Sequence, residues 1–259
     1  MKLNREQMQN WQTNGYLAIE DVIPLEIIEE EKRRFDWLCE HWNSAEAQRL
    51  SPMHETGVLR EEWSKQTVRG FSDLAEHEAI FRQHALHPNL LDIVADLIGT
   101  PFSLYETQAL LKPPSIGSPK PPHQDNAYFC VDPADAVITC WCALDDATIE
   151  NGCMRYVPGS HLHGLIEHEW IKDTPHQVPA GIDPNQAVPV PLRAGGVAIH
   201  HSLTLHCSGP NHSKHWRRPL ICHYVRDDAD LSKAVRSSTS LIPARAAGVA
   251  RQPALSERA

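Results

Sequence analysis

Along the first hundred residues, hydrophobic side chains recur mostly three and four positions apart, the spacing of a helix with one buried face. Residues 4–14 predict a short helix that ends at an Asn-Gly pair, and residues 16–22 predict a short strand. A longer helix is expected over residues 23–42. Two further amphipathic stretches, at 75–86 and 88–99, predict helices, and the second of them ends at a glycine. The N-terminal part is therefore expected to be mainly helical.

In the second part of the chain the pattern changes to short runs of β-branched and aromatic residues separated by turn residues. We expect strands over residues 102–112 and 136–147, and a short strand between two turns within residues 150–161. Residues 195–211 predict a turn, one strand and a second turn, and residues 217–228 predict a last strand. Helices followed by many short strands are typical of an α+β fold, with an antiparallel barrel or double-sheet jelly roll that carries helices on its outside. Because strands and helices do not alternate regularly and no glycine-rich phosphate loop is present, a Rossmann fold is disfavoured.

Other segments show neither the helical spacing of hydrophobic residues nor the runs typical of strands. Residues 43–66 are polar and irregular, residues 113–122 are a proline-rich loop by composition, and residues 163–192 contain scattered prolines. The tail from Leu241 on is rich in Ala, Arg and Pro and is expected to be poorly ordered.

The length of 259 residues suits one large domain with a substantial core. We expect a single domain over residues 1–259, with a helical part at about 1–100, a jelly-roll core at about 101–230 and a tail at about 231–259. The oligomeric state is not readable from the pattern.

Charge and hydropathy narrow the classes of partner. The net charge of -9 and the pI near 5.9 argue against a protein that binds nucleic acid or an anionic membrane surface. No apolar run approaches the roughly 20 residues of a membrane span, and the first residues lack the apolar core of a signal peptide. We therefore expect a small-molecule partner, with neither nucleic acid nor membrane.

The seven cysteines indicate a reducing environment. Their number is odd and none are spaced as a CxxC pair, so buried free thiols in a cytoplasmic protein are expected, rather than disulfides or a zinc site. Cys140 and Cys142 are two positions apart in an apolar run and would face the same side of a strand.

The stretch PPHQDNAYF, residues 121–129, carries the first candidate chemistry. A histidine and an acidic residue two positions apart, His123 and Asp125, can bind one metal ion if a second histidine completes a two-histidine, one-carboxylate site with open positions. The alternative is an ordinary turn exit whose polar side chains bond to the backbone. The second histidine would come from a distant strand, where the candidates are His200, His201 and His206. Of these, His206 is expected at the end of the strand, beside a turn.

Three ordered motifs, HQDNAYF, TCWCALDDATIENGCMRYVPGSH and LHCSGPNHSKHWRRPL, resemble the phytanoyl-CoA dioxygenase (PhyH) family of iron(II)- and 2-oxoglutarate-dependent oxygenases. NGYLAIEDVIP and HPNLLDIVADLIG are also similar to that family, so the resemblance covers roughly residues 5–230. It implies a double-stranded β-helix core (jelly-roll, cupin-like) with flanking N-terminal helices. It also implies Fe(II), 2-oxoglutarate as cosubstrate, and O2.

The resemblance assigns roles residue by residue. His123, Asp125 and His206 match the three iron ligands of the family. Arg217, eleven positions after the last ligand, matches the arginine that pairs with the distal carboxylate of 2-oxoglutarate, and Ser208 matches a hydroxyl that supports that carboxylate.

Further positions match contacts around the cosubstrate. Trp141 matches an aromatic that lines the cosubstrate pocket, Gln108 matches a cosubstrate-contacting position, and Arg69 aligns with a basic cosubstrate contact. Asn126 and Tyr128 directly follow the ligands and are candidate substrate contacts, with turn and packing roles as the alternative.

The implied activity is hydroxylation of an unactivated C–H bond of a small metabolite or natural-product intermediate, with succinate and CO2 as coproducts. Related halogenases replace the aspartate ligand by a small residue, so the presence of Asp125 favours hydroxylation or another oxidation over halogenation. Two alternatives stay open: a non-catalytic jelly roll that binds a metal or ligand, and an oxidase with the same cofactors that performs epimerisation, desaturation or ring formation. No basic cluster for coenzyme A is evident, and the loops at 43–66 and 163–192 are expected to set substrate specificity.

Overall fold

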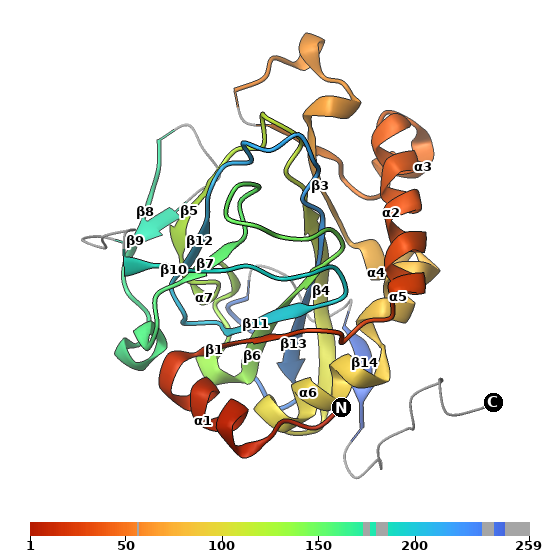
Figure 1. Ribbon diagram of the computed structural model, residues 1–259. Helices are drawn as coiled ribbons and strands as arrows, with labels where there is room; N and C mark the ends of the chain where they lie inside the picture. Colours follow the sequence, from red (N-terminus) through yellow and green to blue (C-terminus); the bar gives the residue numbers. More distant parts are fainter. Residues whose placement is uncertain (56, 173–176, 180–185, 235–240, 247–259) are drawn as a thin grey trace, which may run out of the picture.

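The computed structural model describes residues 1–55, 57–172, 177–179, 186–234 and 241–246. Its two larger sheets face each other across a shared cluster of side chains, and helices cover the outer face of the larger sheet (Figure 1). The architecture is the jelly-roll type with N-terminal helices that the sequence predicts.

The large sheet has eight strands, and its neighbouring strands pair antiparallel. In spatial order they are β1 (Tyr16–Ile19), β11 (Val197–His201), β6 (Val137–Ala143), β13 (Pro219–Arg226), β4 (Phe102–Leu110), β3 (Val68–Ser72) and β2 (Met53–His54), with β14 (Ile242–Arg245) paired to β4.

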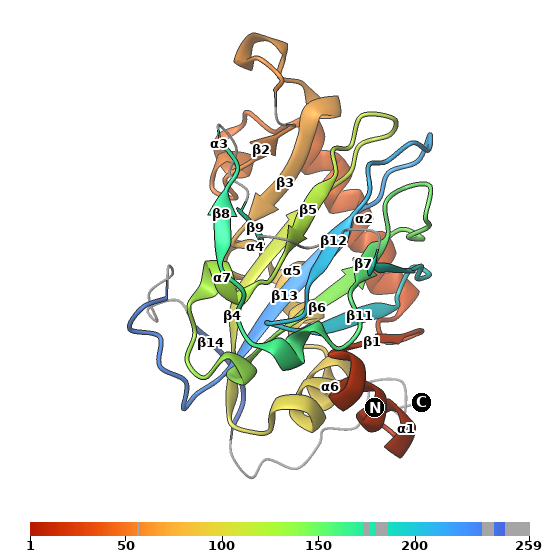
Figure 2. The same cartoon turned by 90° about the vertical axis from the view of Figure 1, so that its left-hand side faces the viewer.

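The small sheet has four antiparallel strands and lies over the other face of the large sheet (Figure 2). Its spatial order is β10 (Val188–Val190), β7 (Met154–Tyr156), β12 (His206–Ser208) and β5 (Lys120–His123). A separate hairpin pairs β8 (His168–Trp170) with β9 (Gln177–Pro179).

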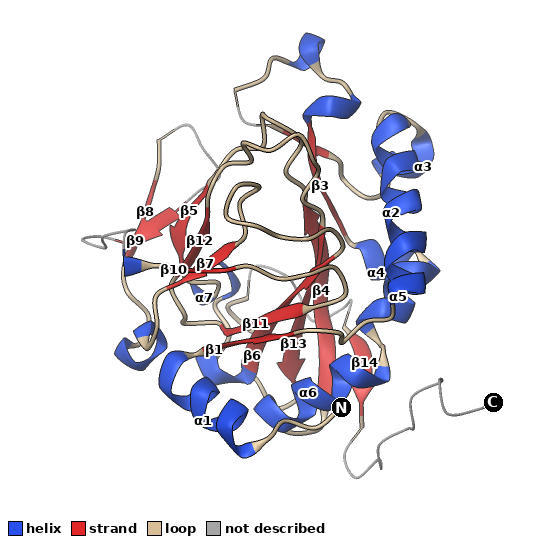
Figure 3. Cartoon of the chain, viewed as in Figure 1, coloured by secondary structure: helices blue, strands red, loops and turns tan. Residues whose placement is uncertain are grey.

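Helices lie mainly along the outside of the strands (Figure 3). The α-helices are α1 (Arg5–Asn14), α2 (Leu25–Glu40), α3 (Ala45–Gln48), α4 (Leu74–His77), α5 (Ala79–Ala85), α6 (Pro88–Ile98) and α7 (Asn126–Phe129). Short 3-10 turns occur at η1 (Arg60–Glu62), η2 (Lys65–Thr67), η3 (Ala134–Ala136) and η4 (Ser160–His163).

Local sequence signals fix the first two elements. Asn4 caps α1, because its side chain accepts a hydrogen bond from the Gln7 backbone while the Gln7 side chain accepts one from the Asn4 backbone. Gly15 ends the helix with a φ of 76°, a left-handed conformation in which glycine carries no Cβ penalty. An added Cβ there would lie 2.4 Å from the His161 ring, so the close approach of η4 also requires glycine. The chain then enters β1 directly.

Alternation along the central strands separates the core from the interior of the jelly roll. In β6, Cys140 and Cys142 pack into the hydrophobic layer beneath the helices, as their two-residue spacing predicts, whereas Trp141 joins the cluster between the sheets. In β13, Cys222 packs toward the helices and Ile221 packs inward. Both strands are buried on both faces, which explains why most of their residues are apolar.

Residues 195–211 form two strands, so the prediction of a single strand was wrong. β11 ends at His201, a turn follows, and β12 begins at His206 in the other sheet. In the turn, the hydroxyls of Ser202 and Thr204 donate to backbone carbonyls of other segments, which lets the chain cross between sheets with its polar groups paired. His206 therefore opens a strand rather than ending one.

The proline-rich loop prediction for residues 113–122 was wrong at its C-terminal end, where β5 begins at Lys120. Pro121 and Pro122 have no N–H to donate, which usually excludes a central strand. β5 is tolerated because it is the edge strand of the small sheet and pairs only with β12.

Three other boundaries differ from prediction. Residues 43–66 contain α3, β2 and η1 rather than irregular loop alone. The helix expected over 75–86 is divided into α4 and α5 at Glu78, which has an extended backbone. Residues 242–245 of the expected disordered tail form β14, while residues 235–240 and 247–259 lie outside the described residues.

Candidate active site

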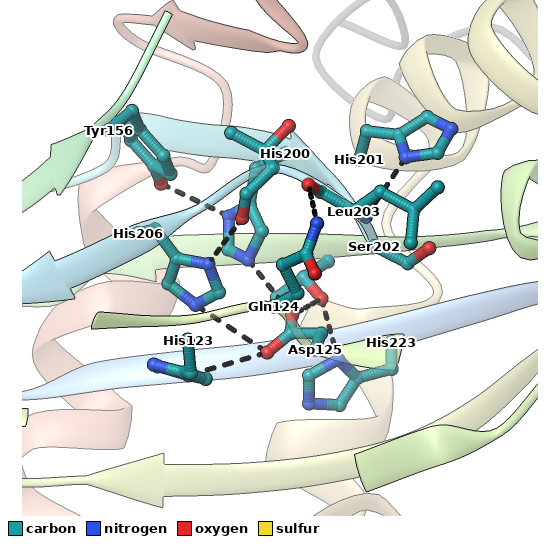
Figure 4. Close-up of polar contacts among 12 residues, drawn as sticks. His123, Gln124, Asp125, Tyr156, His200, His201, Ser202, Leu203, His206 and His223 are labelled. Carbon is teal, nitrogen blue, oxygen red and sulfur yellow. Dashed lines mark hydrogen bonds and ion pairs between the residues drawn. The ribbon is translucent and has the colours of Figure 1, made fainter. Parts of the chain in front are cut away.

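The two sheets bring His123, Asp125 and His206 together. His123 is the last residue of β5, Asp125 directly precedes α7, and His206 is the first residue of β12, directly opposite His123 in the strand pairing. One ligand atom from each residue lies within 4.8 Å of the others, and all three side chains are buried. Figure 4 shows the two imidazoles and the carboxylate turned toward one point. Among the described residues, no other His, Cys, Asp or Glu group meets this spacing.

Hydrogen bonds fix which nitrogen of each imidazole faces that point. The Nδ1 atom of His123 lies 2.8 Å from the Pro121 carbonyl, and the Nδ1 atom of His206 lies 2.9 Å from the Thr204 carbonyl. A carbonyl can only accept, so each Nδ1 carries the proton and each Nε2 keeps a free lone pair. The Nε2 atoms lie 3.6 Å and 3.5 Å from the same oxygen of Asp125, Oδ1.

The electrostatics suit metal ligation. Burial lowers the pKa of His123 well below its ordinary value, and burial together with the neighbouring His200 lowers the pKa of His206 to about 4. Burial alone would raise the pKa of the Asp125 carboxyl, but the imidazoles of His206 and His200 outweigh it and hold that pKa well below its ordinary value. Two neutral imidazoles and one carboxylate are the deprotonated donors that a metal ion needs.

This donor set fits ferrous iron. Two Nε2 atoms and one carboxylate oxygen form a two-histidine, one-carboxylate arrangement, which holds non-haem iron(II) and leaves other coordination positions open. The alternative that His123 and Asp125 are merely a turn exit bonded to the backbone does not account for the convergence of His206 on the same oxygen.

His200 contacts the centre without joining the three converging ligand atoms. Its Nε2 lies 3.0 Å from Oδ2 of Asp125, and its Nδ1 lies 3.1 Å from the Tyr156 hydroxyl. His201, on the other face of β11, instead lies against the rings of Trp11 and His161. Of the three candidate histidines, the structure therefore groups only His206 with His123 and Asp125.

One cavity of about 600 Å³ contains this centre and extends between the sheets. Its lining includes the metal-ligand candidates and all five predicted cosubstrate contacts. These contacts are Arg69, Gln108, Trp141, Ser208 and Arg217.

Arg217 is the clearest anion-binding group in the cavity. Its side chain is buried, and its Nε atom has no hydrogen-bond partner among the described residues. The guanidinium lies 5.1 Å from the centre of the Trp141 ring, which forms a flat wall beside it. Burial lowers the pKa of Arg217 to about 9. A buried guanidinium with an unpaired N–H is costly unless an anion binds there, so this end of the cavity fits a carboxylate.

The backbone around Arg217 is held firmly. Arg217 and Lys112 exchange two backbone hydrogen bonds, of 3.0 Å and 3.2 Å. The Asn211 side chain also donates to the carbonyls of Lys112 and His215, which fixes the loop that leads to the arginine. The backbone that carries the guanidinium is thus fixed by an isolated β-bridge just outside β4 and β13.

A β-bulge places two β5 side chains in the cavity. His206 and Ser208 are two positions apart on β12, yet they pair with His123 and Lys120, which are three positions apart on β5. All four side chains line the cavity. Lys120 also lies 5.0 Å from the centre of the Tyr128 ring, and burial followed by the charge of Arg69 lowers the Lys120 pKa to about 8.

The two candidate substrate contacts have different positions. Tyr128 lines the cavity, and its ring meets the His123 ring edge-on at 5.7 Å. The Asn126 amide instead makes two hydrogen bonds with the backbone of Val131, and it is not among the residues that line the cavity. These contacts favour the turn role that was its alternative, and a substrate contact of Asn126 stays a prediction.

The expected specificity loops differ in what they contribute. Pro52, Met53, His54 and Trp63, all within residues 43–66, line the cavity, and the His54 and Trp63 rings stack at 4.2 Å. The described part of 163–192 contributes no residue to the lining, although His168 and Ile166 bond to Gln124 beside the centre. Residues 173–176 and 180–185 of that segment lie outside the described residues.

Sequence reasoning missed two residues that touch the centre indirectly, Thr139 and His223. Strand alternation carried a signal for both, because Thr139 lies two positions before the inward-facing Trp141, and His223 two positions after the inward-facing Ile221. It also missed the cavity-lining lysines Lys112 and Lys120.

The sequence and structure of the chain are similar to those of a known group of oxygenases. The sequence model of the family described as phytanoyl-CoA dioxygenase (PhyH) matches residues 11–219. A probable phytanoyl-CoA dioxygenase of Caenorhabditis elegans is 29% identical over 87% of this chain and 76% of that protein. The peroxisomal phytanoyl-CoA dioxygenase of Homo sapiens is 25% identical over 96% of this chain and 76% of that protein.

Solved structures of similar fold include enzymes of several outcomes. The non-haem monooxygenase ThoJ has a TM-score of 0.74 and 26% identity, and the match covers 92% of this chain and 82% of that chain. The epimerase SnoN, solved with Fe3+, α-ketoglutarate and nogalamycin RO, has a TM-score of 0.68 and 26% identity over 87% and 84% of the two chains. The α-ketoglutarate-dependent carbocyclase SnoK has a TM-score of 0.67 and 26% identity over 91% and 89%.

Proposed function

The chain belongs to the phytanoyl-CoA dioxygenase family, and from this premise we propose that it hydroxylates a C–H bond of a small molecule. It is an enzyme of the 2-oxoglutarate-dependent non-haem iron oxygenase class, and its cofactors are Fe(II), 2-oxoglutarate and O2. The observation that carries the proposal is that the buried His-Asp-His cluster and the buried Arg217 line the same cavity.

His123, Asp125 and His206 would hold the iron through two Nε2 atoms and Oδ1 of the carboxylate. Bound together, iron(II) and 2-oxoglutarate activate dioxygen for oxidation of a C–H bond, and succinate and carbon dioxide are released. The protein residues supply the ligand geometry and bury all three ligand side chains.

Arg217 would bind the distal carboxylate of 2-oxoglutarate, with Trp141 as a flat wall beside it and Ser208 on β12 of the small sheet. A planar guanidinium can grip a carboxylate through two parallel hydrogen bonds, which fixes the orientation of the cosubstrate as well as its affinity.

The substrate would enter between Tyr128 on α7 and the aromatic side chains of His54 and Trp63. A cavity of about 600 Å³ is in the range of sites for small organic ligands, and it must also accommodate the cosubstrate. We therefore propose a small metabolite or natural-product intermediate as substrate.

The test is an anaerobic spectroscopic experiment that needs no substrate. Purified protein with iron(II) and 2-oxoglutarate should develop a visible metal-to-ligand charge-transfer band, and admission of air should give slow, uncoupled formation of succinate. A folded, metal-loaded protein without the band would refute the proposal in favour of a non-catalytic binding protein.

Epimerisation and ring closure are the second candidates for the reaction, because the structure is similar to those of the epimerase SnoN and the carbocyclase SnoK. Product mass separates the possibilities once a substrate is found. Hydroxylation adds one oxygen atom, epimerisation leaves the mass unchanged, and ring closure removes two hydrogen atoms.

The location of the protein in the cell stays a prediction. Over the residues described, the helices are all too short or too polar to cross a membrane. We propose a cytoplasmic location from the free cysteines, although the human relative is named as peroxisomal.

A further inference from the structure

The two oxygens of Asp125 have different surroundings. Oδ1 faces the Nε2 atoms of His123 and His206, where a metal ion would bind. Oδ2 accepts hydrogen bonds from His200 (Figure 4) and from the Thr139 hydroxyl. The carboxylate is therefore held by one oxygen so that the other is presented to the metal.

The hydrogen bond from Thr139 is the end of a longer chain. The Thr139 hydroxyl oxygen lies 2.9 Å from Nδ1 of His223, and Nε2 of His223 lies 3.1 Å from the Gln108 amide nitrogen. The chain runs across three adjacent strands, because Thr139 is on β6, His223 on β13 and Gln108 on β4.

The directions of these hydrogen bonds follow from the chemistry of the groups. An ionised carboxylate only accepts, so the Thr139 proton points to Asp125. The Thr139 oxygen must then accept the proton on Nδ1 of His223. Nε2 of His223 is left as an acceptor, so the amide nitrogen of Gln108, not its oxygen, faces it as a donor.

Thr139 and His223 are both buried. A buried polar side chain destabilises the fold unless it has a hydrogen-bond partner. Thr139 and His223 are also direct partners in the strand register. The side chains are thus set by the rigid sheet rather than by a loop, as a device that orients a ligand requires.

We propose that Thr139 and His223 are positioning residues that hold Asp125 for one-oxygen metal ligation, and that Gln108 acts through His223. This inference rests on the proposed function. It also modifies the role that family resemblance implies for Gln108, since its amide nitrogen is directed at His223 in the cavity wall.

The first experiment measures metal affinity rather than turnover. Thr139→Val removes the hydroxyl and keeps the shape, and cobalt(II) titration followed by absorption should show affinity lowered by about 10- to 100-fold. Thr139→Ser should restore most of the affinity, because it restores the donor. The matched control is Thr107→Val, the same change on β4, where the hydroxyl bonds to Ala75 and Glu76 on the helix side of the sheet. This control should bind cobalt(II) as the unaltered protein does.

The second experiment is a double-mutant cycle between Gln108 and His223. His223→Phe and Gln108→Leu should each lower metal affinity and shift the charge-transfer band of the iron(II)–2-oxoglutarate complex. The double variant should lose no more metal affinity than the single variants do. His223→Asn should partly restore the band, because its amide can donate to Thr139 in place of Nδ1. Additive losses, or a Gln108→Leu effect confined to the dissociation constant of 2-oxoglutarate, would overturn the role proposed for Gln108.

The outcomes separate this inference from the proposed function. If the unaltered protein binds cobalt(II) and iron(II) but folded Thr139→Val binds them equally well, the positioning role is wrong and the oxygenase assignment stands. If the unaltered protein binds neither metal, the proposed function itself fails. Circular dichroism of each variant ensures that lost affinity is not lost structure.

Discussion

Arg217 and Arg218 are adjacent in the chain, yet their guanidinium groups serve opposite faces of the large sheet. Arg217 lines the cavity and lies over Trp141. Arg218 is bound through two nitrogens to the carboxylate of Asp145 and through a third, at 2.6 Å, to Asp36 of α2. Alternation along the chain that leads into β13 thus separates a binding group from a structural group in neighbouring positions.

Arg217→Met should raise the apparent KM for 2-oxoglutarate by about 30- to 100-fold, equivalent to roughly 2–3 kcal/mol for a lost buried charge pair. The thermal midpoint should fall little, because the side chain has no protein ion pair among the described residues. Steady-state succinate formation measures the KM. An unchanged KM would remove Arg217 from the cosubstrate site.

Arg218→Met is the matched control and should behave in the opposite way. Removing one partner of this buried ion pair should lower the free energy of unfolding by about 3 kcal/mol, because Asp145 loses its bidentate partner. Denaturant unfolding measures the loss. The KM for 2-oxoglutarate should stay near its original value, and a large increase would mean that the two faces are not independent.

Asp125→Ala and His206→Ala should each abolish the charge-transfer band and succinate formation. The fold should persist with a loss of at most about 2–3 kcal/mol, the cost of leaving a few buried groups unpaired. His201→Ala is the control. His201 lies outside the cavity, so this variant should still bind the metal. Global unfolding of both ligand variants would identify these residues as structural.

Iron(II) and 2-oxoglutarate should raise the thermal midpoint of the protein. A ligand that binds only the folded state at 100 times its dissociation constant adds about 2.7 kcal/mol of stability. Differential scanning fluorimetry under argon measures the shift. The shift should vanish in Asp125→Ala, and its persistence there would show that the carboxylate is not needed to hold the metal.

Cys130 should be the one thiol that reacts rapidly with an aromatic disulfide reagent in the native protein at pH 8. It is exposed, whereas the other cysteines are buried. Burial raises the pKa of Cys39 to about 12 and raises the pKa of Cys140 well above its ordinary value, so these thiols stay protonated. Cys130→Ala should remove the fast phase, and a persistent fast phase would place another thiol within reach of solvent.

Much of the fold could be predicted from local pattern. The apolar spacing of residues 23–42 and the β-branched run over 136–147 gave elements close to α2 and β6. β5 could not be predicted, because two prolines argue against a strand unless its position at a sheet edge is known. The division between β11 and β12 depends on tertiary hydrogen bonds of Ser202 and Thr204, which no local pattern carries.

Some residues of the candidate site could also be predicted from the sequence, and others could not. Spacing and motif context pointed to His123, Asp125 and His206, and the structure places the three together, although their role as iron ligands stays a proposal. Strand alternation carried a signal that Thr139 and His223 face inward, but their relation to Asp125 could not be predicted because it depends on which strands are neighbours in the sheet.

The position of the centre also bears on how the chain folds. His123 and His206 are separated by roughly eighty residues, so one ion bound to both closes a long loop, much as a disulfide does. Closing such a loop in the unfolded chain costs conformational entropy, and the native strand pairing of β5 with β12 has already met that cost. A metal ion should therefore bind late, after the strands have paired, and then chiefly slow unfolding rather than speed folding.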